Sequence, residues 1–374
     1  MVKKKTQVTA AALVGRRTAA LNRARKDAKA DALLITRPED VSYLTGFTGG
    51  DSAALLTGKR TVLVTDGRYS EQAQSECPGV EVHSRSKALL EVVAEYFHEY
   101  KANLMAVQGG HMTVVWAEAL GKYVGKGKLV STRELVTKLR EEKDESEVAA
   151  VRRSIGVAEK AFAELVGQGR KAFVGRSERE VAAELDYRMR CGGASASAFE
   201  TIVAAGTNGS KPHYRPSDRK IGRHEPVLID WGALVEGYCS DLTRVVFTGR
   251  IPAELAEVYS VVLRAQKAGI DAIRPGVACK TVDAAARKVI EDAGYGEAFV
   301  HGLGHGIGRE IHERPHVAGS VTDRLRSGMI TTVEPGIYLP GIGGVRIEDD
   351  VLVTAKGRRK LTSLPRDMKA MVLS

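Results

Sequence analysis

The stretch Val227-Leu228-Ile229-Asp230-Trp231-Gly232 is an apolar strand pattern that ends in an acidic residue. A second predicted strand, Leu242 to Thr248, begins directly after Asp241. The residues between them, Ala233 to Tyr238, suit a hairpin, so Asp230 and Asp241 are predicted to face each other across adjacent strands. A carboxylate in a strand interior costs several kcal/mol unless it is paired or bound to a metal.

The same arrangement recurs near the carboxyl end of the chain. Glu334 lies in the apolar run Thr332-Val333-Glu334-Pro335-Gly336, and Glu348 lies in Gly344-Val345-Arg346-Ile347-Glu348-Asp349-Asp350. Because side chains alternate along a strand, Arg346 and Glu348 are predicted to share one face. Two acidic hairpins in one part of the chain indicate a shared cation.

A glycine-rich segment, His301-Gly302-Leu303-Gly304-His305-Gly306-Ile307-Gly308, lies between the two hairpins. Its glycines let the backbone approach closely and present the imidazoles. The segment lacks the GxGxxG spacing of a dinucleotide-binding loop, so phosphate binding is not expected. Each residue alone has an ordinary structural explanation, but four carboxylates and one imidazole together suit Mn²⁺, Co²⁺ or Zn²⁺ in a two-metal site. Such a site lowers the pKa of a bridging water and polarises a carbonyl.

The composition is that of an ordinary globular protein, with 43% hydrophobic and 27% charged residues in a chain of 374, a length that favours two domains. The net charge of +10, with many basic residues between Lys3 and Lys26, raises the hypothesis of a nucleic-acid partner. No known nucleic-acid-binding motif accompanies these residues. We therefore interpret the segment as a solvated terminal helix and expect no nucleic-acid partner.

The cysteines indicate a reducing compartment. Cys77, Cys191, Cys239 and Cys279 are widely spaced and form no CxxC pair. Neither a disulfide framework nor a thiolate zinc site is expected, which fits the cytoplasm. No run of about 18 apolar residues occurs, so no membrane span is expected.

Strand and helix patterns alternate in the first part of the chain, which is typical of a small α/β domain. The expected elements are strands at 32–36 and 80–83, a hairpin within 53–65, and helices at 69–76 and 89–100. Residues 1–13 are expected to be flexible, and the charged run 140–147 is interpreted as a linker. We place the domain boundary at residue 138.

The second part is predicted to hold longer helices and the strands that carry the acids. The helices are expected at 144–167, from Ser177-Glu178-Arg179-Glu180 onward, at 252–273 and at 279–294, and the strands near 199–204, 226–231, 242–248, 330–338 and 344–354. The motif at Ser177 matches a capping box, in which the serine and Glu180 satisfy free backbone amides.

These residues resemble those of the pita-bread metallopeptidases (family M24), and within that family the prolidase and aminopeptidase P type. The local motifs that carry the resemblance are Asp230-Trp-Gly232, Ser240-Asp241-Leu-Thr-Arg244, Gly304-His305-Gly-Ile-Gly308, His312-Glu313-Arg-Pro315, Val333-Glu334-Pro-Gly336 and Val345-Arg346-Ile-Glu348-Asp349. Tyr43-Leu-Thr-Gly-Phe47 and Thr65-Asp66-Gly-Arg-Tyr69 are similar to segments of the creatinase/prolidase amino-terminal domain. The resemblance implies an α/β plus α+β fold, with a ribonuclease-H-like domain at 1–138 and a pita-bread catalytic domain at 139–374.

The resemblance also implies an activity, namely metal-dependent hydrolysis of the peptide bond preceding proline by a metal-bridging water. It implies two divalent ions, most of all Mn²⁺ with Co²⁺ or Zn²⁺ as alternatives, in an enzyme that forms a homodimer; the cytoplasmic location is expected from the cysteines. The substrates would be proline-containing peptides, cleaved by an Xaa-Pro aminopeptidase or by a strict Xaa-Pro dipeptidase (prolidase). A more remote alternative is a catalytically inactive pita-bread binding protein, which the basic amino terminus would suit.

The family's order of metal ligands, Asp, Asp, His, Glu, Glu, is carried here by Asp230, Asp241, His305, Glu334 and Glu348. Asp230 resembles the bidentate ligand of one metal, and Asp241 and Glu348 resemble the bridging pair. His305 and Glu334 resemble the ligands that complete the second metal, and Glu334 would also relay the proton of the water.

Four more residues resemble those around the family's substrate. His213 and His312 resemble the histidines that hold the scissile carbonyl and stabilise the tetrahedral intermediate. His301 would line the pocket, and Arg346 would orient a metal carboxylate.

Two departures from the family pattern argue against strict dipeptide specificity. Prolidases often carry an arginine after the proline of the His-Glu-x-Pro segment, placed to hold a dipeptide's carboxylate. Here that position is His316, while Arg314 lies before Pro315. Arg309 occupies a position that is commonly apolar.

Overall fold

The computed structural model describes residues 10–58 and 60–374. Contacts divide the chain into two compact units, of which the first ends at Leu139 and the second spans Arg140–Ser374. The domain boundary at residue 138 stays a prediction, because a domain is defined by its ability to fold alone and not by contacts. Residues 10–13, predicted to be flexible, begin helix α1 (Ala10–Asp27), because Ala10-Ala11-Ala12-Leu13 is a run of strong helix formers. The rest of that predicted flexible leader, 1–9, lies outside the described residues.

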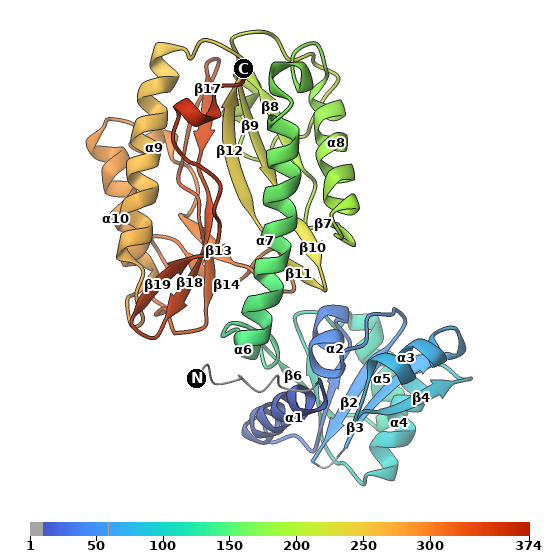
Figure 1. The fold of residues 1–374 in the computed structure, drawn as a ribbon. Coiled ribbons are helices and arrows are strands. Elements are labelled where there is room, and N and C mark those ends of the chain that lie inside the picture. The colour runs from blue at the N-terminus through green and yellow to red at the C-terminus, as the bar shows by residue number, and fades with distance from the viewer. Residues whose placement is uncertain (1–9, 59) are drawn as a thin grey trace, which may run out of the picture. The chain divides into compact units, whose positions relative to one another are not determined.

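The first unit is a six-stranded mixed sheet with helices on both faces (Figure 1). Its strands, in spatial order, are β4 (Glu81–Arg85), β3 (Thr61–Asp66), β2 (Ala53–Thr57), β1 (Ala32–Ile35), β5 (Met105–Gln108) and β6 (Leu129–Thr132). Its helices after α1 are α2 (Pro38–Thr45), α3 (Ser70–Glu76), α4 (Leu89–Glu99) and α5 (Val114–Val124), and α6 (Thr137–Arg140) follows. Leu33 shares an apolar cluster with Leu44 of α2, whereas its neighbour Leu34 belongs to the cluster on the other face. The predicted α/β alternation and the β2–β3 hairpin are confirmed.

The charged run 140–147, interpreted as a linker, is instead held in place by buried ion pairs. The side chains of Arg140 and Lys143 are only 2% and 1% exposed, and both pair with Glu313, Lys143 at 3.2 Å. A run of charges is usually solvated, but these charges meet opposite charges from a distant segment of the chain. The local sequence of the run does not show that opposite charges from a distant segment will lie beside it.

Two pairs of helices flank the strands of the second unit (Figure 1). The pairs are α7 (Glu145–Val166) with α8 (Glu178–Cys191), and α9 (Ala253–Ala272) with α10 (Cys279–Asp292). Helix α8 begins at the predicted capping box, in which Glu180 N donates to Ser177 Oγ at 3.1 Å. Phe162 of α7 stacks on Trp231 with ring centroids 4.3 Å apart, which fixes the helix against the strand that ends beside Asp230. Within the described part of the chain, no helix has both the length and the apolar character needed to cross a membrane.

Antiparallel strands make up the sheets of the second unit. They are β7 (Ala196–Ser197), β8 (Ile202–Ala205), β9 (Pro226–Trp231), β10 (Ala233–Val235), β11 (Tyr238–Cys239), β12 (Leu242–Phe247), β13 (Gly304–Gly306), β14 (Glu313–Val317), β15 (Ile330–Val333), β16 (Gly336–Leu339), β17 (Gly343–Arg346), β18 (Asp349–Thr354) and β19 (Gly357–Lys360). The order in one sheet is β12-β9-β8, and in another it is β14-β13-β15-β18-β19. Part of the glycine-rich segment thus forms a strand, β13, inside the second of these sheets.

Each of the two long strands predicted near the carboxyl end is broken at its acidic residue. The run 330–338 splits into β15 and β16 around Glu334, and the run 344–354 splits into β17 and β18 around Glu348. Strand β15 pairs with β18, whereas β16 pairs with β17, so the chain changes sheet at each break. Pro335, which lacks an amide hydrogen, follows Glu334 and cannot continue the ladder. Both acids therefore leave the strand ladders at the junction of the two sheets.

Candidate metal centre

Asp230 and Asp241 are supplied by the neighbouring strands β9 and β12. The residue directly opposite Asp230 is Thr243, so the predicted face-to-face pairing of the two acids is wrong in register. Asp241 precedes β12 and is diagonal to Asp230, because the chain between the strands forms a separate hairpin, β10–β11, instead of a direct turn. Diagonal neighbours on a sheet remain within reach of each other. Both side chains line the same cavity.

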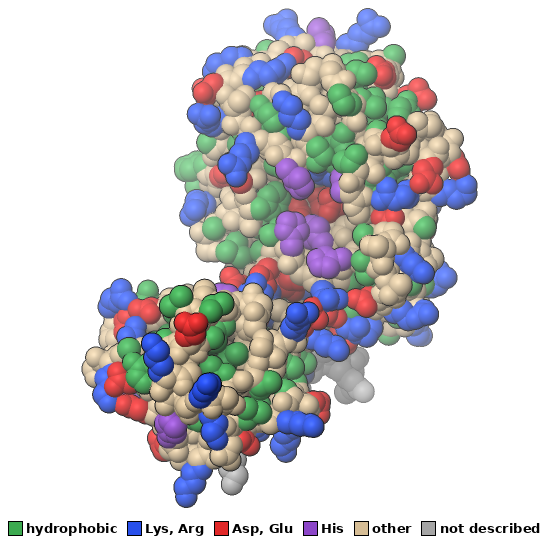
Figure 2. Space-filling view, turned by 180° about the vertical axis from the view of Figure 1, so that it is seen from behind, with side chains coloured by type: hydrophobic (Ala, Val, Ile, Leu, Met, Phe, Trp, Pro, Cys, Tyr) green, Lys and Arg blue, Asp and Glu red, His purple; other side chains and the backbone are tan. Residues whose placement is uncertain are grey.

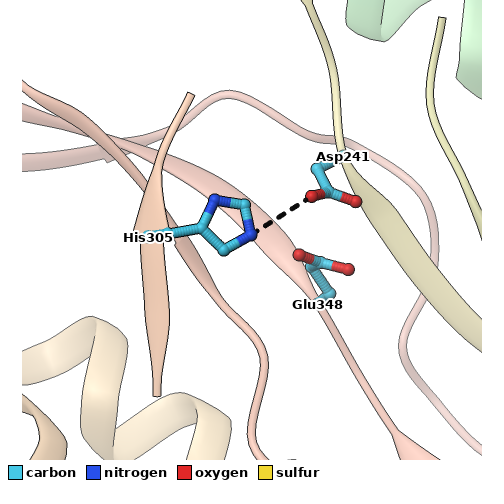
Figure 3. Close-up of side chains that lie close together, drawn as sticks. All are labelled: Asp241, His305 and Glu348. Carbon is cyan, nitrogen blue, oxygen red and sulfur yellow. Dashed lines mark ion pairs between the residues drawn. The ribbon is translucent and has the colours of Figure 1, made fainter. Parts of the chain in front are cut away.

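Asp241, His305 and Glu348 converge from three separate segments of the chain (Figure 3). One potential ligand atom from each lies within 4.8 Å of the others, and the His305 ring points toward the two carboxylates. His305 Nε2 lies 3.4 Å from Asp241 Oδ2 and 3.3 Å from Glu334 Oε1. Asp230 and Glu334 line the cavity together with Asp241 and His305. The fold therefore gathers all five predicted ligands at one place.

Two carboxylate oxygens in this group, Asp230 Oδ1 and Glu348 Oε1, are buried without a hydrogen-bond partner among the described residues. A buried acceptor that lacks a donor is costly and uncommon in a folded protein. A cation would satisfy both oxygens, and four carboxylates with one imidazole form a donor set that Mn²⁺, Co²⁺ and Zn²⁺ accept. The residues present therefore fit divalent metal ions.

The electrostatics of the cluster also favour a cation. Burial, reinforced by neighbouring carboxylates, raises the pKa of Asp241 and of Glu348 well above the ordinary value. Burial opposes the charge of Glu334 as well, but its contact with His305 lowers the pKa of Glu334 to about 2 and raises the pKa of His305. A proton on His305 thus offsets part of the negative charge, and a bound metal ion would replace that proton.

Arg346 connects the carboxylates of the two acidic hairpins. Its guanidinium donates to Asp230 Oδ2 at 2.5 Å, to Thr243 Oγ1 at 3.0 Å and to the Tyr338 hydroxyl at 2.7 Å. Thr243 in turn donates to Glu348 Oε2 at 2.7 Å. Burial raises the pKa of Asp230, and the positive charge of Arg346 limits the rise. Arg346 therefore orients Asp230 directly and Glu348 through Thr243.

Thr332 has the corresponding position in the other acidic hairpin. Its hydroxyl donates to Glu334 Oε1 at 3.0 Å and accepts from the His305 amide at 3.0 Å. Sequence reasoning missed both Thr243 and Thr332. The signal that could have found them is their spacing, because each lies two residues from an acidic residue of the cluster and residues at that spacing share a strand face.

A cavity of about 520 Å³ opens in front of the cluster and is lined by His213, His301 and His312. Histidine side chains gather around a hollow that has acidic side chains inside it (Figure 2). The ring of His312 lies 4.4 Å from the ring of His305, centroid to centroid. Burial, and then the nearby charge of His305, lower the pKa of His312, so its imidazole is neutral at neutral pH.

His301 is fixed by two hydrogen bonds that define its tautomer. Its Nδ1 lies 2.8 Å from the Gly302 carbonyl oxygen, which can only accept, so Nδ1 carries the hydrogen. Its Nε2 therefore accepts from the Tyr338 hydroxyl at 2.9 Å. Burial lowers the pKa of His301 and keeps the ring neutral. Tyr338, which no sequence signal marked, thus links His301 to Arg346.

The residues that depart from the family pattern lie in different environments. His316 is directly opposite His305 in the β13–β14 pair and lines the cavity. Arg314 instead forms an exposed ion pair, and the Arg309 guanidinium lies over the ring of Tyr238 at 4.8 Å. Of these three described residues, His316 lines the cavity, and Arg309 and Arg314 do not.

Known proteins share both parts of the chain. Residues 149–355 match metallopeptidase family M24, and residues 17–141 match the creatinase/prolidase N-terminal domain. The Xaa-Pro dipeptidase of Pyrococcus furiosus is 41% identical over 341 residues, which are 90% of this chain and 95% of that protein.

Two solved structures are similar over nearly their whole length. The Xaa-Pro dipeptidase from Bacillus anthracis has a TM-score of 0.92 at 36% identity, covering 96% of this chain and 100% of that one. The X-Pro aminopeptidase from Thermotoga maritima has a TM-score of 0.88 at 36% identity, covering 94% of this chain and 100% of that one. The chain therefore belongs to metallopeptidase family M24, with a creatinase-type, ribonuclease-H-like amino-terminal domain followed by a pita-bread catalytic domain.

Proposed function

We propose that the protein hydrolyses the peptide bond that precedes proline, as an Xaa-Pro aminopeptidase with two bound divalent metal ions. The observation that carries the proposal is the pair of buried oxygens of Asp230 and Glu348 that lack a hydrogen-bond partner among the described residues, within a cluster of four carboxylates and His305. The names of the related dipeptidases and aminopeptidase support the choice of substrate. Family membership supports the reaction type.

Five residues would hold the ions. Asp230 would bind one ion, Asp241 and Glu348 would be shared, and His305 and Glu334 would complete the second site. The oxygen-rich donor set is compatible with Mn²⁺, which we propose as the native ion, and with Co²⁺ or Zn²⁺. Bound ions of this kind supply Lewis-acid activation of water and of a peptide carbonyl.

The protein's own side chains supply proton transfer and positioning. The Glu334 carboxylate, which lines the cavity, would take a proton from the attacking water and return it to the leaving nitrogen. His213 and His312 line the cavity and would donate hydrogen bonds to the oxygen on which negative charge develops. The His301 ring, held by Tyr338, forms a fixed wall of the pocket.

His316 supports the aminopeptidase version over the strict dipeptidase version. An arginine at this position would offer a planar fork that matches a carboxylate with two parallel hydrogen bonds. A histidine offers a single donor and leaves more room. A substrate that continues beyond proline has no carboxylate there, so a weaker anion site does not reduce its binding affinity.

The test combines metal analysis with two substrates. Protein purified without chelator should contain two divalent ions per chain and cleave both an Xaa-Pro dipeptide and an Xaa-Pro-Yaa tripeptide, with the tripeptide preferred. A matched Xaa-Ala-Yaa tripeptide should be a poor substrate. Activity confined to the dipeptide would establish the prolidase alternative. A protein that binds none of Mn²⁺, Co²⁺ and Zn²⁺ and hydrolyses neither proline peptide would favour the inactive binding protein.

We further propose that the enzyme is a cytoplasmic homodimer that acts on proline-containing peptides. All four cysteines lie within the described residues as free thiols, which supports a reducing compartment. The dimer is an expectation from the resemblance to the family. Sedimentation equilibrium of the purified protein tests it, and a monomer at micromolar concentration would contradict it.

A further inference from the structure

Glu178 is a fully buried carboxylate that belongs to none of the roles assigned above. It is the first residue of α8, and its exposed fraction is 0%. Its side chain points to the segment 205–217, which carries His213 into the cavity. Between the short 3-10 turn Gly206–Ser210 and β9, the described chain forms no helix or strand. Regular secondary structure therefore does not hold His213 in place.

The two oxygens of Glu178 bind the segment on both sides of His213. Oε1 accepts from the Ala205 amide at 2.9 Å and from Asn208 Nδ2 at 3.0 Å. Oε2 accepts from the Tyr214 hydroxyl at 2.8 Å, and from the Ser217 amide and hydroxyl at 3.1 Å and 2.7 Å. One carboxylate thus gathers five donors from four residues of the segment.

These bonds require an anion. Burial opposes the charge of Glu178, yet the hydrogen bonds from the segment lower its pKa, so it is ionised at neutral pH. A glutamine has one accepting oxygen and one donating amide group. Whichever way its amide is turned, it would place a donor against the amide of Ala205 or of Ser217, and a backbone amide cannot rotate to accept.

We propose that Glu178 is a positioning residue that fixes the 205–217 segment and thereby presents His213 to the substrate. The proposal rests on the proposed function, in which His213 assists the reaction. A second contact anchors the same segment to the metal centre, because Arg346 Nη1 donates to the Pro212 carbonyl at 3.4 Å. Loss of Glu178 would therefore loosen the segment around His213 while the cluster of metal ligands stays intact.

The surrounding structure predicts that Glu178→Gln folds. Ser177 and Glu180 still cap α8, and the backbone bonds between Gly175 and Ile221 and between Glu178 N and Arg219 O do not involve the carboxylate. Glu180→Gln is the matched control, because it removes an acid from the same helix turn. Its carboxylate faces Ser177 and Lys220 instead of the His213 segment.

The experiment is a double-mutant cycle on Xaa-Pro-Yaa hydrolysis with Glu178→Gln, His213→Ala and the combined variant. We expect Glu178→Gln to lower kcat by about tenfold to a hundredfold with little change in KM, since an oxyanion donor is worth roughly 10²- to 10³-fold. In the His213→Ala background the same substitution should change kcat by less than about twofold. Metal content should stay at the wild-type value, and Glu180→Gln should keep wild-type kcat.

Two results would overturn the proposal: an equal loss of kcat from Glu178→Gln with and without His213, or a fall in metal content. If Glu178→Gln does not fold, Ser217→Ala removes one donor from the segment side and should give a smaller loss of kcat that also vanishes without His213.

Hydrogen exchange separates this proposal from the proposed function. Exchange in 205–217 should be faster in Glu178→Gln than in wild type, whereas Glu180→Gln should leave it unchanged. A wild-type protein without peptidase activity would contradict the proposed function but not the anchoring. Unchanged exchange in 205–217 would contradict the anchoring even in an active enzyme.

Discussion

Thr243 Oγ1 donates to Glu348 Oε2 at 2.7 Å and accepts from Arg346 Nε at 3.0 Å. The hydroxyl has a single hydrogen, and the bond from Arg346 directs that hydrogen to Glu348. The other carboxylate oxygen, Glu348 Oε1, has no partner among the described residues. Thr243 thus fixes the orientation in which the Glu348 carboxylate would face the metal ions.

Replacing Thr243 with valine should weaken metal binding while the fold is kept. Valine matches the shape of threonine but cannot orient Glu348, and loss of a partner that orients a ligand typically costs about 10- to 100-fold in metal affinity. The measurement is a Mn²⁺ titration by calorimetry. Thr243→Ser keeps the hydroxyl and should bind nearly as well as wild type; equal weakening in both variants would mean that packing, not the hydrogen bond, is responsible.

Asp241→Ala should abolish peptidase activity, because this carboxylate would serve both ions. We expect less than about 1% of wild-type kcat and loss of metal, since the Lewis-acid contribution disappears with the ions. Asp323→Ala is the matched control, as that acid forms an exposed pair with Arg314. Near-wild-type turnover of the Asp241 variant, measured with Mn²⁺ in excess, would argue strongly against the proposed site.

The sequence allowed prediction of the elements that carry the site, because the acids stand out in apolar strand patterns. It did not predict how those strands end. The chain changes sheet at Glu334 and Glu348, and the register sets Thr243 opposite Asp230. Periodicity within one strand contains no information about the strand with which it pairs.

Two residues, one beside the site and one in the charged run 140–147, were missed for a related reason. Tyr338 and Arg140 acquire their roles from partners that are distant in sequence, His301 for Tyr338 and Glu313 for Arg140. A tyrosine in a strand and an arginine in a charged run are ordinary residues until the fold supplies those partners. The roles of Tyr338 and Arg140 therefore depend on tertiary contacts, which the local sequence pattern does not reveal.

His316→Arg should shift specificity toward dipeptides. His316 lines the cavity opposite His305, and an arginine there could hold the carboxylate of an Xaa-Pro dipeptide with two hydrogen bonds. We expect the ratio of kcat/KM for Xaa-Pro to that for Xaa-Pro-Yaa to rise by about tenfold or more, as a charged hydrogen bond is worth roughly 1.5–3 kcal/mol. Because glutamine adds no charge, His316→Gln is the control. An unchanged ratio in His316→Arg would place the carboxylate site elsewhere.

Glu313 makes stability depend on pH through its buried contacts with Arg140 and Lys143. Burial opposes its charge, but the two cations lower its pKa below the ordinary 4.5. A carboxylate with a lowered pKa in the folded state contributes stability that is fully present above its unfolded pKa and is lost as pH falls through the folded pKa.

Glu313→Gln should therefore reduce the free energy of unfolding at neutral pH by about 3 kcal/mol, because buried Lys143 loses the carboxylate that it pairs with, while Arg140 keeps its ion pair with Glu310. The difference in unfolding free energy from wild type should shrink as pH falls below the ordinary carboxyl range, where Glu313 itself becomes protonated.

Urea unfolding with EDTA, followed by Trp231 fluorescence in a Trp116→Phe background, measures the free energy of unfolding without bound metal. Glu236→Gln, which breaks an exposed pair with Arg153, should have little effect at any pH. If Glu313→Gln is less stable than wild type by the same amount at neutral and at acidic pH, the shape of the Glu313 side chain, and not its charge, stabilises the fold.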